Sequence, residues 1–134
     1  MAAKNVSLFV IFLLIAVWAE GAWALSGQAL LDSCEEHIKT RDSDKVHTRA
    51  HAFDSGVRAG NCVGYIYGVI ESHDFLTLKN RSMSRFCMPR SVGAGHLIGV
   101  VLRHIKGDPL SLERIAAEEI ALALSAAFPC ARQR

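Results

Sequence analysis

Four cysteines constrain this sequence more than any other feature: Cys34, Cys62, Cys87 and Cys130. All four follow an apolar N-terminal segment of the kind that directs export. An even number of cysteines in a small exported chain indicates two disulfides. A zinc site is the competing interpretation, but the sequence has no Cys-x-x-Cys pair and the cysteines are widely separated. We therefore predict two disulfides and no metal.

The N-terminal segment, residues 1–24, has the three parts of a secretory signal peptide. Lys4 provides a positive start, Val6 to Trp18 form an apolar run, and Ala22-Trp23-Ala24 places small residues at both positions that the peptidase requires. A retained membrane anchor is the alternative, but the run is shorter than the roughly 20 residues that span a bilayer. We predict cleavage after Ala24, leaving one domain over residues 25–134 without a membrane segment.

Size and charge exclude several classes of function. A chain of 134 residues allows one small domain. A net charge of +2 is too small to indicate a nucleic-acid or polybasic membrane binder. Aromatic residues at 7% are too few for a base-stacking platform.

Apolar periodicity predicts helices and no strands. The predicted helices cover about residues 26–38, 53–73, 92–105 and 108–127, with Ser26 and Asp108 as N-caps. A polar stretch, residues 40–52, and a loop, residues 76–91, connect them. The predicted fold class is all-α: a small, four-helix, disulfide-stapled single domain.

The short Gly107-Asp108-Pro109 connection predicts that the last two helices are antiparallel neighbours. That arrangement brings Cys87, before the third helix, close to Cys130, after the fourth. Three pairings of four cysteines are possible. Of these we favour Cys34–Cys62 with Cys87–Cys130.

The second predicted helix carries a glycine at every fourth position. Each glycine costs about 1 kcal/mol relative to alanine in a helix, so some contact should offset the cost. We predict close backbone contact with a neighbouring helix inside the domain, the alternative being a flexible Gly-rich turn. The four residues are Gly56, Gly60, Gly64 and Gly68.

Catalytic chemistry is not indicated. His47 and His51 are four residues apart and could share a helix face, but no third ligand has useful spacing. Cysteines paired in disulfides leave no thiol nucleophile, and neither a G-x-S-x-G nor a phosphate-binding glycine loop is present. We predict that the protein is not an enzyme and carries no cofactor.

The loop after the second helix is the candidate binding segment. Its cations would suit a partner surface that carries carboxylates. The alternative is that it is only a solvated connection. The candidate partner-binding residues are Lys79, Asn80, Arg81, Ser82 and Arg85, with Arg90 adding to the positive charge.

Several motifs occur in the order found in a known family. Residues 62–69 are similar to its C-x-G-Y-x-x-G-V helix, and residues 86–89 to its F-C-x-P motif. Val100-Val101, Asp108-Pro109 and residues 126–130 resemble its closing half. Together they resemble the Rap/Tai-type immunity proteins of type VI secretion systems over about residues 26–130, although His96 stands where glutamine is common.

The resemblance implies a periplasmic, all-helical and often dimeric protein. Such proteins bind a cognate peptidoglycan amidase effector and block its cleft sterically, without chemistry of their own. Two other functions remain open from the sequence. One is a small periplasmic acid-stress chaperone, and the other is a metal-binding accessory protein that uses His47 and His51.

Overall fold

The computed structural model describes residues 24–41 and 48–130, and these fold into four α-helices. The helices are α2 (Gly27–Arg41), α3 (Arg49–Lys79), α4 (Ala94–Gly107) and α5 (Ala116–Ala127), with short 3-10 helices η1 (Arg81–Met83) and η2 (Pro109–Leu112). The predicted all-α fold class is confirmed. The predicted signal peptide falls almost entirely outside the described residues. Within those residues no helix is both long and apolar enough to cross a bilayer.

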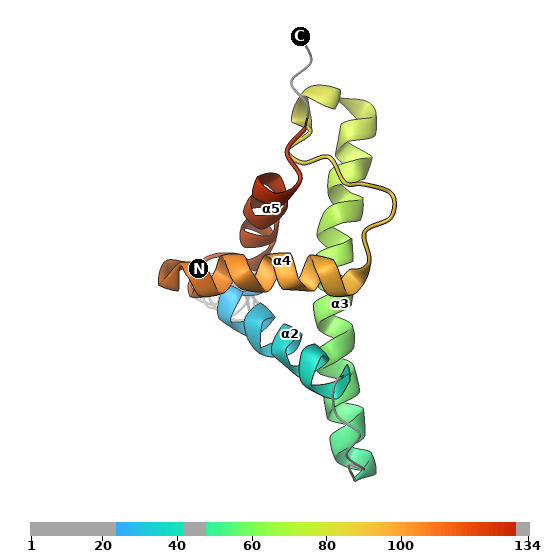
Figure 1. Ribbon diagram of the computed structural model, residues 1–134, viewed down its shortest axis with the longest axis vertical. Helices are drawn as coiled ribbons and strands as arrows, with labels where there is room; N and C mark the ends of the chain where they lie inside the picture. The colour runs from blue at the N-terminus through green and yellow to red at the C-terminus, as the bar shows by residue number, and fades with distance from the viewer. Residues whose placement is uncertain (1–23, 42–47, 131–134) are drawn as a thin grey trace, which may run out of the picture.

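The long helix α3 forms the axis of the molecule (Figure 1). Helix α2 contacts its first half, α4 crosses it near the middle, and α5 lies toward its second half. The end of α3 and the following segment project beyond the other helices, where Figure 1 shows them beside the segment that follows α5.

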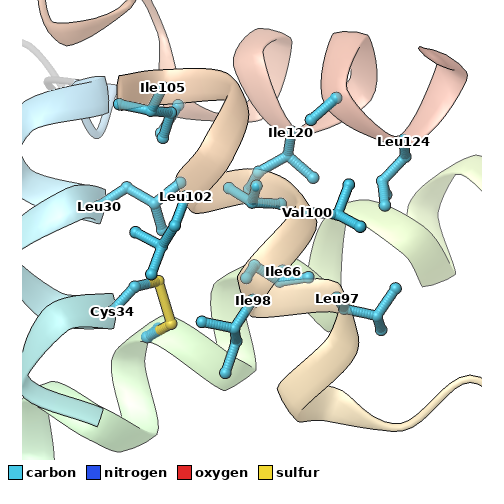
Figure 2. Packing of buried hydrophobic residues seen from close by; sticks show 14 of the residues in the cluster. Leu30, Cys34, Ile66, Leu97, Ile98, Val100, Leu102, Ile105, Ile120 and Leu124 are labelled. Atoms are coloured by element: carbon cyan, nitrogen blue, oxygen red, sulfur yellow. A yellow bond between two sulfur atoms is a disulfide. The ribbon is translucent and has the colours of Figure 1, made fainter. Parts of the chain in front are cut away.

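Helix α4 supplies the centre of the hydrophobic core. Figure 2 shows its side chains surrounded by Leu30 from α2, Ile66 from α3, and Ile120 and Leu124 from α5. All four of these neighbours are at most 1% exposed. The six buried residues of α4 are Leu97, Ile98, Val100, Val101, Leu102 and Ile105.

Both predicted disulfides are confirmed. Cys34–Cys62 joins α2 to α3 inside the core, and Cys87–Cys130 joins the segment after η1 to the segment after α5. However, the antiparallel arrangement predicted for α4 and α5 is wrong. Eight residues, 108–115, connect these helices, and Figure 1 shows α5 running along the molecule while α4 runs across it.

Two predicted helix ranges need correction. Helix α3 spans Arg49–Lys79, longer at both ends than residues 53–73, because Thr48 caps it by accepting a hydrogen bond from the His51 amide (3.4 Å). Asp108 caps η2 rather than a long fourth helix, accepting from the Leu110 amide (3.0 Å), and α5 begins only at Ala116.

The start of α2 is fixed against the connection between η2 and α5. Gly27 donates to the Arg114 carbonyl (2.9 Å), and Ala116 donates to the Leu25 carbonyl (2.7 Å). A Cβ on Gly27 would lie 2.0 Å from the backbone oxygen of Ser111. Only glycine allows the two backbones to come this close, a requirement that the sequence pattern did not indicate.

A buried carboxylate organises the same connection. Glu119 of α5 is 0% exposed, and its oxygens lie 2.9 Å from His104 Nε2 and 3.4 Å from Arg114 Nη1. Burial alone would raise the pKa of Glu119. Contacts with the Ser111 hydroxyl, Arg114 and His104 outweigh burial and lower that pKa. The Ser111 hydroxyl is otherwise buried without a hydrogen bond of good geometry.

The close contact predicted for the glycine ridge is not formed among the described residues. Gly56, Gly60, Gly64 and Gly68 are all exposed, and a Cβ at any of them would meet nothing within 4 Å. The buried side of α3 is built by residues such as Cys62 and Ile66. Each lies two positions, or about 200°, from a glycine. The ridge therefore faces away from the core.

Candidate functional site

The candidate binding residues lie at the projecting end of the molecule, which we call the tip and define as residues 73–87. Lys79 is the last residue of α3, Asn80 follows it, and η1 contains Arg81 and Ser82. Arg85 lies in the extended segment after η1. All five predicted residues are exposed.

Apolar side chains also cover the tip, a feature that the charge pattern does not predict. Phe75 is 58% exposed, Leu76 47%, Leu78 86% and Met83 48%. The sequence pattern predicts a helix that ends at His73 and a polar loop over residues 76–91, which contains Leu76, Leu78 and Met83. The apolar residues within this cation-rich segment were the sequence signal that could have revealed an exposed apolar surface. Exposed apolar side chains grouped together are typical of an interaction surface.

His73 holds the segment after η1 against α3. Its Nε2 accepts a hydrogen bond from the Arg85 amide (3.0 Å), and its ring stacks on Phe86 with centroids 3.8 Å apart. With Nε2 as an acceptor, Nδ1 carries the proton and can donate to Asp74 Oδ1 (3.3 Å). Phe86 is only 2% exposed, so it fixes the extended segment to the body of the protein.

Asn80 organises the turn between α3 and η1. Its side-chain oxygen accepts from the Ser82 amide (3.1 Å) and from the Ser82 hydroxyl (2.7 Å), and its own amide donates to the Leu76 carbonyl (3.0 Å). Asn80 and Ser82 therefore shape the turn, whereas Arg81 between them is exposed. The turn is ordered by these local bonds before any partner binds.

The charge of the tip is positive. Lys79, Arg81 and Arg85 outnumber the single acidic residue, Asp74. The Lys79 ammonium lies 5.0 Å from the centre of the Phe75 ring, within range of a cation–π contact. Cations beside exposed apolar groups suit a partner that offers an apolar cleft with carboxylates at its edge.

A groove of about 890 Å³ runs along one side of the tip and continues over α3. Gly60, Gly64 and Gly68 line it from α3, Ala117 and Ala121 line it from α5, and Leu25, Tyr65, Met83 and Phe86 are among its apolar contacts. Its walls are mostly small or apolar residues.

No metal centre is found in the described ranges 24–41 and 48–130, where no three residues of the His, Cys, Asp and Glu types are grouped. Of the two histidines considered for metal binding, His47 lies outside those ranges. His51 is at the start of α3, its Nδ1 3.3 Å from the Ser55 hydroxyl. Both disulfides are formed, and no free cysteine is left.

Comparison with known proteins identifies a family for this chain. No curated protein matches the chain. The family described as Rap1a immunity proteins matches residues 26–130, which include all four helices, both disulfides and the whole tip. The chain therefore belongs to the Rap1a immunity protein family.

Proposed function

We propose that this protein is a periplasmic immunity protein that binds and sterically inhibits a peptidoglycan amidase delivered by a type VI secretion system. The proposal rests on the family and on one observation: the tip is exposed, apolar and basic, yet already ordered. A preordered surface loses little conformational entropy when it binds.

In this mechanism the tip enters the substrate cleft of the amidase and excludes the peptide stem. Leu78 and Met83 would fill apolar parts of the cleft, while Arg81 and Arg85 pair with carboxylates at its edge. The inhibitor needs no catalytic group or cofactor, since occupying the cleft is sufficient. We infer accordingly that the protein is not an enzyme.

Export fits the same mechanism, because an amidase that cuts peptidoglycan acts outside the cytoplasm. We propose that residues 1–24 are a signal peptide and that the mature protein is the domain of residues 25–134. Disulfides form and persist in oxidising compartments such as the bacterial periplasm. The Leu25 carbonyl already bonds to Ala116, so cleavage after Ala24 would remove no residue used in this contact.

The test is binding of the mature protein, with both disulfides formed, to a purified amidase encoded beside its gene. We expect a tight complex and loss of amidase activity at equal molar amounts. Arg81→Glu and Leu78→Asp should each weaken binding by about 2 kcal/mol, or about 30-fold, as for central interface residues. Matched controls are Arg103→Glu on α4 and Leu110→Asp on η2, both exposed and distant in the fold from the tip. Equal effects of the tip and control variants would contradict the proposal.

We also propose that the protein forms a homodimer, which the resemblance implies, through the part of the exposed α3 face that carries Gly60, Gly64 and Gly68 and lines the groove. Four glycines cost α3 about 3 to 4 kcal/mol of helix propensity, and no contact of the described residues offsets this cost. Light scattering should give twice the chain mass. Gly64→Leu should give the monomer mass, while Ala126→Leu, at an exposed position of α5, should leave the dimer intact.

A further inference from the structure

The two disulfides lie in very different environments. Cys34 and Cys62 are both 0% exposed in the core. Cys87 is exposed and Cys130 is partly exposed. A thiolate must reach a sulfur atom in order to break a disulfide. Only Cys87–Cys130 offers such access in the folded protein.

A cavity gives access to the exposed disulfide. It has a volume of about 680 Å³, is lined by both Cys87 and Cys130, and also contacts Arg81, Ser82 and Ser84. Arg81 and the disulfide therefore line the same cavity. A nearby cation stabilises thiolates and lowers their pKa.

Ser84 lies directly beside the disulfide. Its hydroxyl oxygen is 3.3 Å from Cys130 Sγ and 3.7 Å from Cys87 Sγ, and it can also donate to the Phe86 carbonyl (3.3 Å). When a thiolate forms on Cys130, this hydroxyl can turn its proton toward the sulfur. Attack on the more exposed Cys87 would therefore release Cys130 as a thiolate beside the Ser84 hydroxyl, which can donate a hydrogen bond to it.

We propose that Cys87–Cys130 is a thiol–disulfide exchange site for a dithiol reductant, and that its state controls the order of the tip. One thiolate of the dithiol bonds to Cys87 Sγ, the bond between the cysteines breaks, and Cys130 leaves as a thiolate that takes up a proton. The second thiol of the dithiol then attacks the dithiol's own sulfur atom in the mixed disulfide. This step releases Cys87 as a thiolate that takes up a proton. The protein gains two electrons and two protons, and the dithiol becomes a disulfide.

The tip would lose its anchor to α5 in this reaction, while the core would remain. Two links join the tip to the residues just after α5. One is the disulfide, and the other is the hydrogen bond from the Cys87 amide to the Phe128 carbonyl (2.9 Å). The core around α4 and the buried Cys34–Cys62 pair do not depend on this link. The inference that reduction weakens amidase binding rests on the proposed function. The inference that this disulfide exchanges with a dithiol does not.

The first experiment measures exchange on the protein alone. The oxidised protein is treated with limiting dithiothreitol, quenched with an alkylating agent and analysed by peptide mass spectrometry. We expect Cys87 and Cys130 to be alkylated at least tenfold faster than Cys34 and Cys62, with helical circular dichroism retained. Equal rates for the two pairs, or loss of helicity on the first reduction, would overturn the proposal.

The role of the hydroxyl is tested by a matched pair of variants. Ser84→Ala should slow reduction of the exposed disulfide several-fold, whereas Ser82→Ala, also at the cavity, should not. Ser82 bonds to Asn80 and has no contact with a sulfur atom among the bonds described. An unchanged rate of reduction in Ser84→Ala would show that the hydroxyl has no role in the exchange and would overturn that part of the inference.

The order of the tip is followed by limited trypsin digestion after Arg81 and Arg85. Selective reduction and alkylation should speed cleavage there at least tenfold, and equal cleavage in both forms would refute control of the tip. Amidase binding is then compared for the two forms. If the oxidised form does not bind, the proposed function fails while the exchange and digestion results stand. If both forms bind equally, only the redox condition on binding fails.

Discussion

Replacing Gly27 by alanine should destabilise the protein strongly, although alanine is normally the better helix residue. The added Cβ would lie 2.0 Å from the Ser111 oxygen and 2.9 Å from the Ser111 carbonyl carbon. The two backbones would have to separate by about 1.5 Å to restore van der Waals contact. That separation strains a buried site, at about 1 to 3 kcal/mol.

The same movement would weaken two backbone hydrogen bonds, from Gly27 to the Arg114 carbonyl and from Ala116 to the Leu25 carbonyl. Each contributes about 1 kcal/mol, and the helix propensity of alanine returns at most about 1 kcal/mol. The expected net loss is about 2 to 4 kcal/mol. Because Gly56 is exposed with open space around it, Gly56→Ala should instead stabilise the protein by about 0.5 to 1 kcal/mol.

The assay is urea unfolding followed by circular dichroism, with both disulfides intact. The free energy of unfolding should fall for Gly27→Ala and rise for Gly56→Ala, with the same dependence on urea in both. If Gly27→Ala were within about 0.5 kcal/mol of the wild type, the close approach of α2 to Ser111 would not exist as described. That result would refute the reasoning.

Three further predictions concern the disulfides, the buried carboxylate and the tip. Replacing Cys34 and Cys62 by alanine should lower the unfolding free energy by about 3 to 4 kcal/mol, as the loop-entropy relation gives for a separation of 28 residues, and an unchanged urea midpoint would contradict this. Because the pKa of Glu119 lies below its ordinary value of 4.5 in the folded protein, its stabilisation is complete above about pH 4.5 and is lost as the pH falls through the folded pKa. Glu119→Gln should therefore reduce the acid dependence of the urea midpoint, and an identical acid profile would count against the buried ion pairs. His73→Ala should speed hydrogen exchange of the Arg85 amide about fivefold, for a lost bond of about 1 kcal/mol, and unchanged exchange would show that the ring does not hold this segment.

The sequence predicted the helices because they depend on local pattern, and it predicted two disulfides because an even number of cysteines follows an export segment. Apolar periodicity placed α4 nearly correctly. The pairing of Cys87 with Cys130 is confirmed, although the antiparallel packing of the last two helices from which it was predicted is not formed. Yet the crossing of α4 and α5 depends on the conformation of residues 108–115. Their path is set by the tertiary contacts of Ser111, Arg114 and Glu119, which no periodicity reports.

The glycine pattern was misinterpreted for a related reason. Spacing shows that Gly60 and Gly64 share a face of α3, but it does not show which face meets the core. The residues two positions away, such as Cys62 and Ile66, decide that question. Conversely, Gly27 belongs to no pattern, and only the folded backbone reveals that a side chain there would collide with Ser111.

The candidate binding residues were located from charge alone, which selected residues at the projecting end of the molecule but not the apolar side chains beside them. Lys79, Arg81 and Arg85 are exposed as predicted. The apolar half of the tip was missed because α3 continues to Lys79, which carries Phe75 and Leu78 outward on a helix. Helix ends depend on caps such as Asn80 and are the least certain feature of a sequence pattern.

Survival of cells that make the candidate amidase in their periplasm tests the whole account most directly. One strain produces the full chain, and the other produces residues 25–134 with only an initiating methionine, at equal protein levels. The full chain should restore growth, while the unexported form should leave the cells to lyse. Lysis in both strains would contradict inhibition of this amidase, and equal protection by both would contradict action outside the cytoplasm.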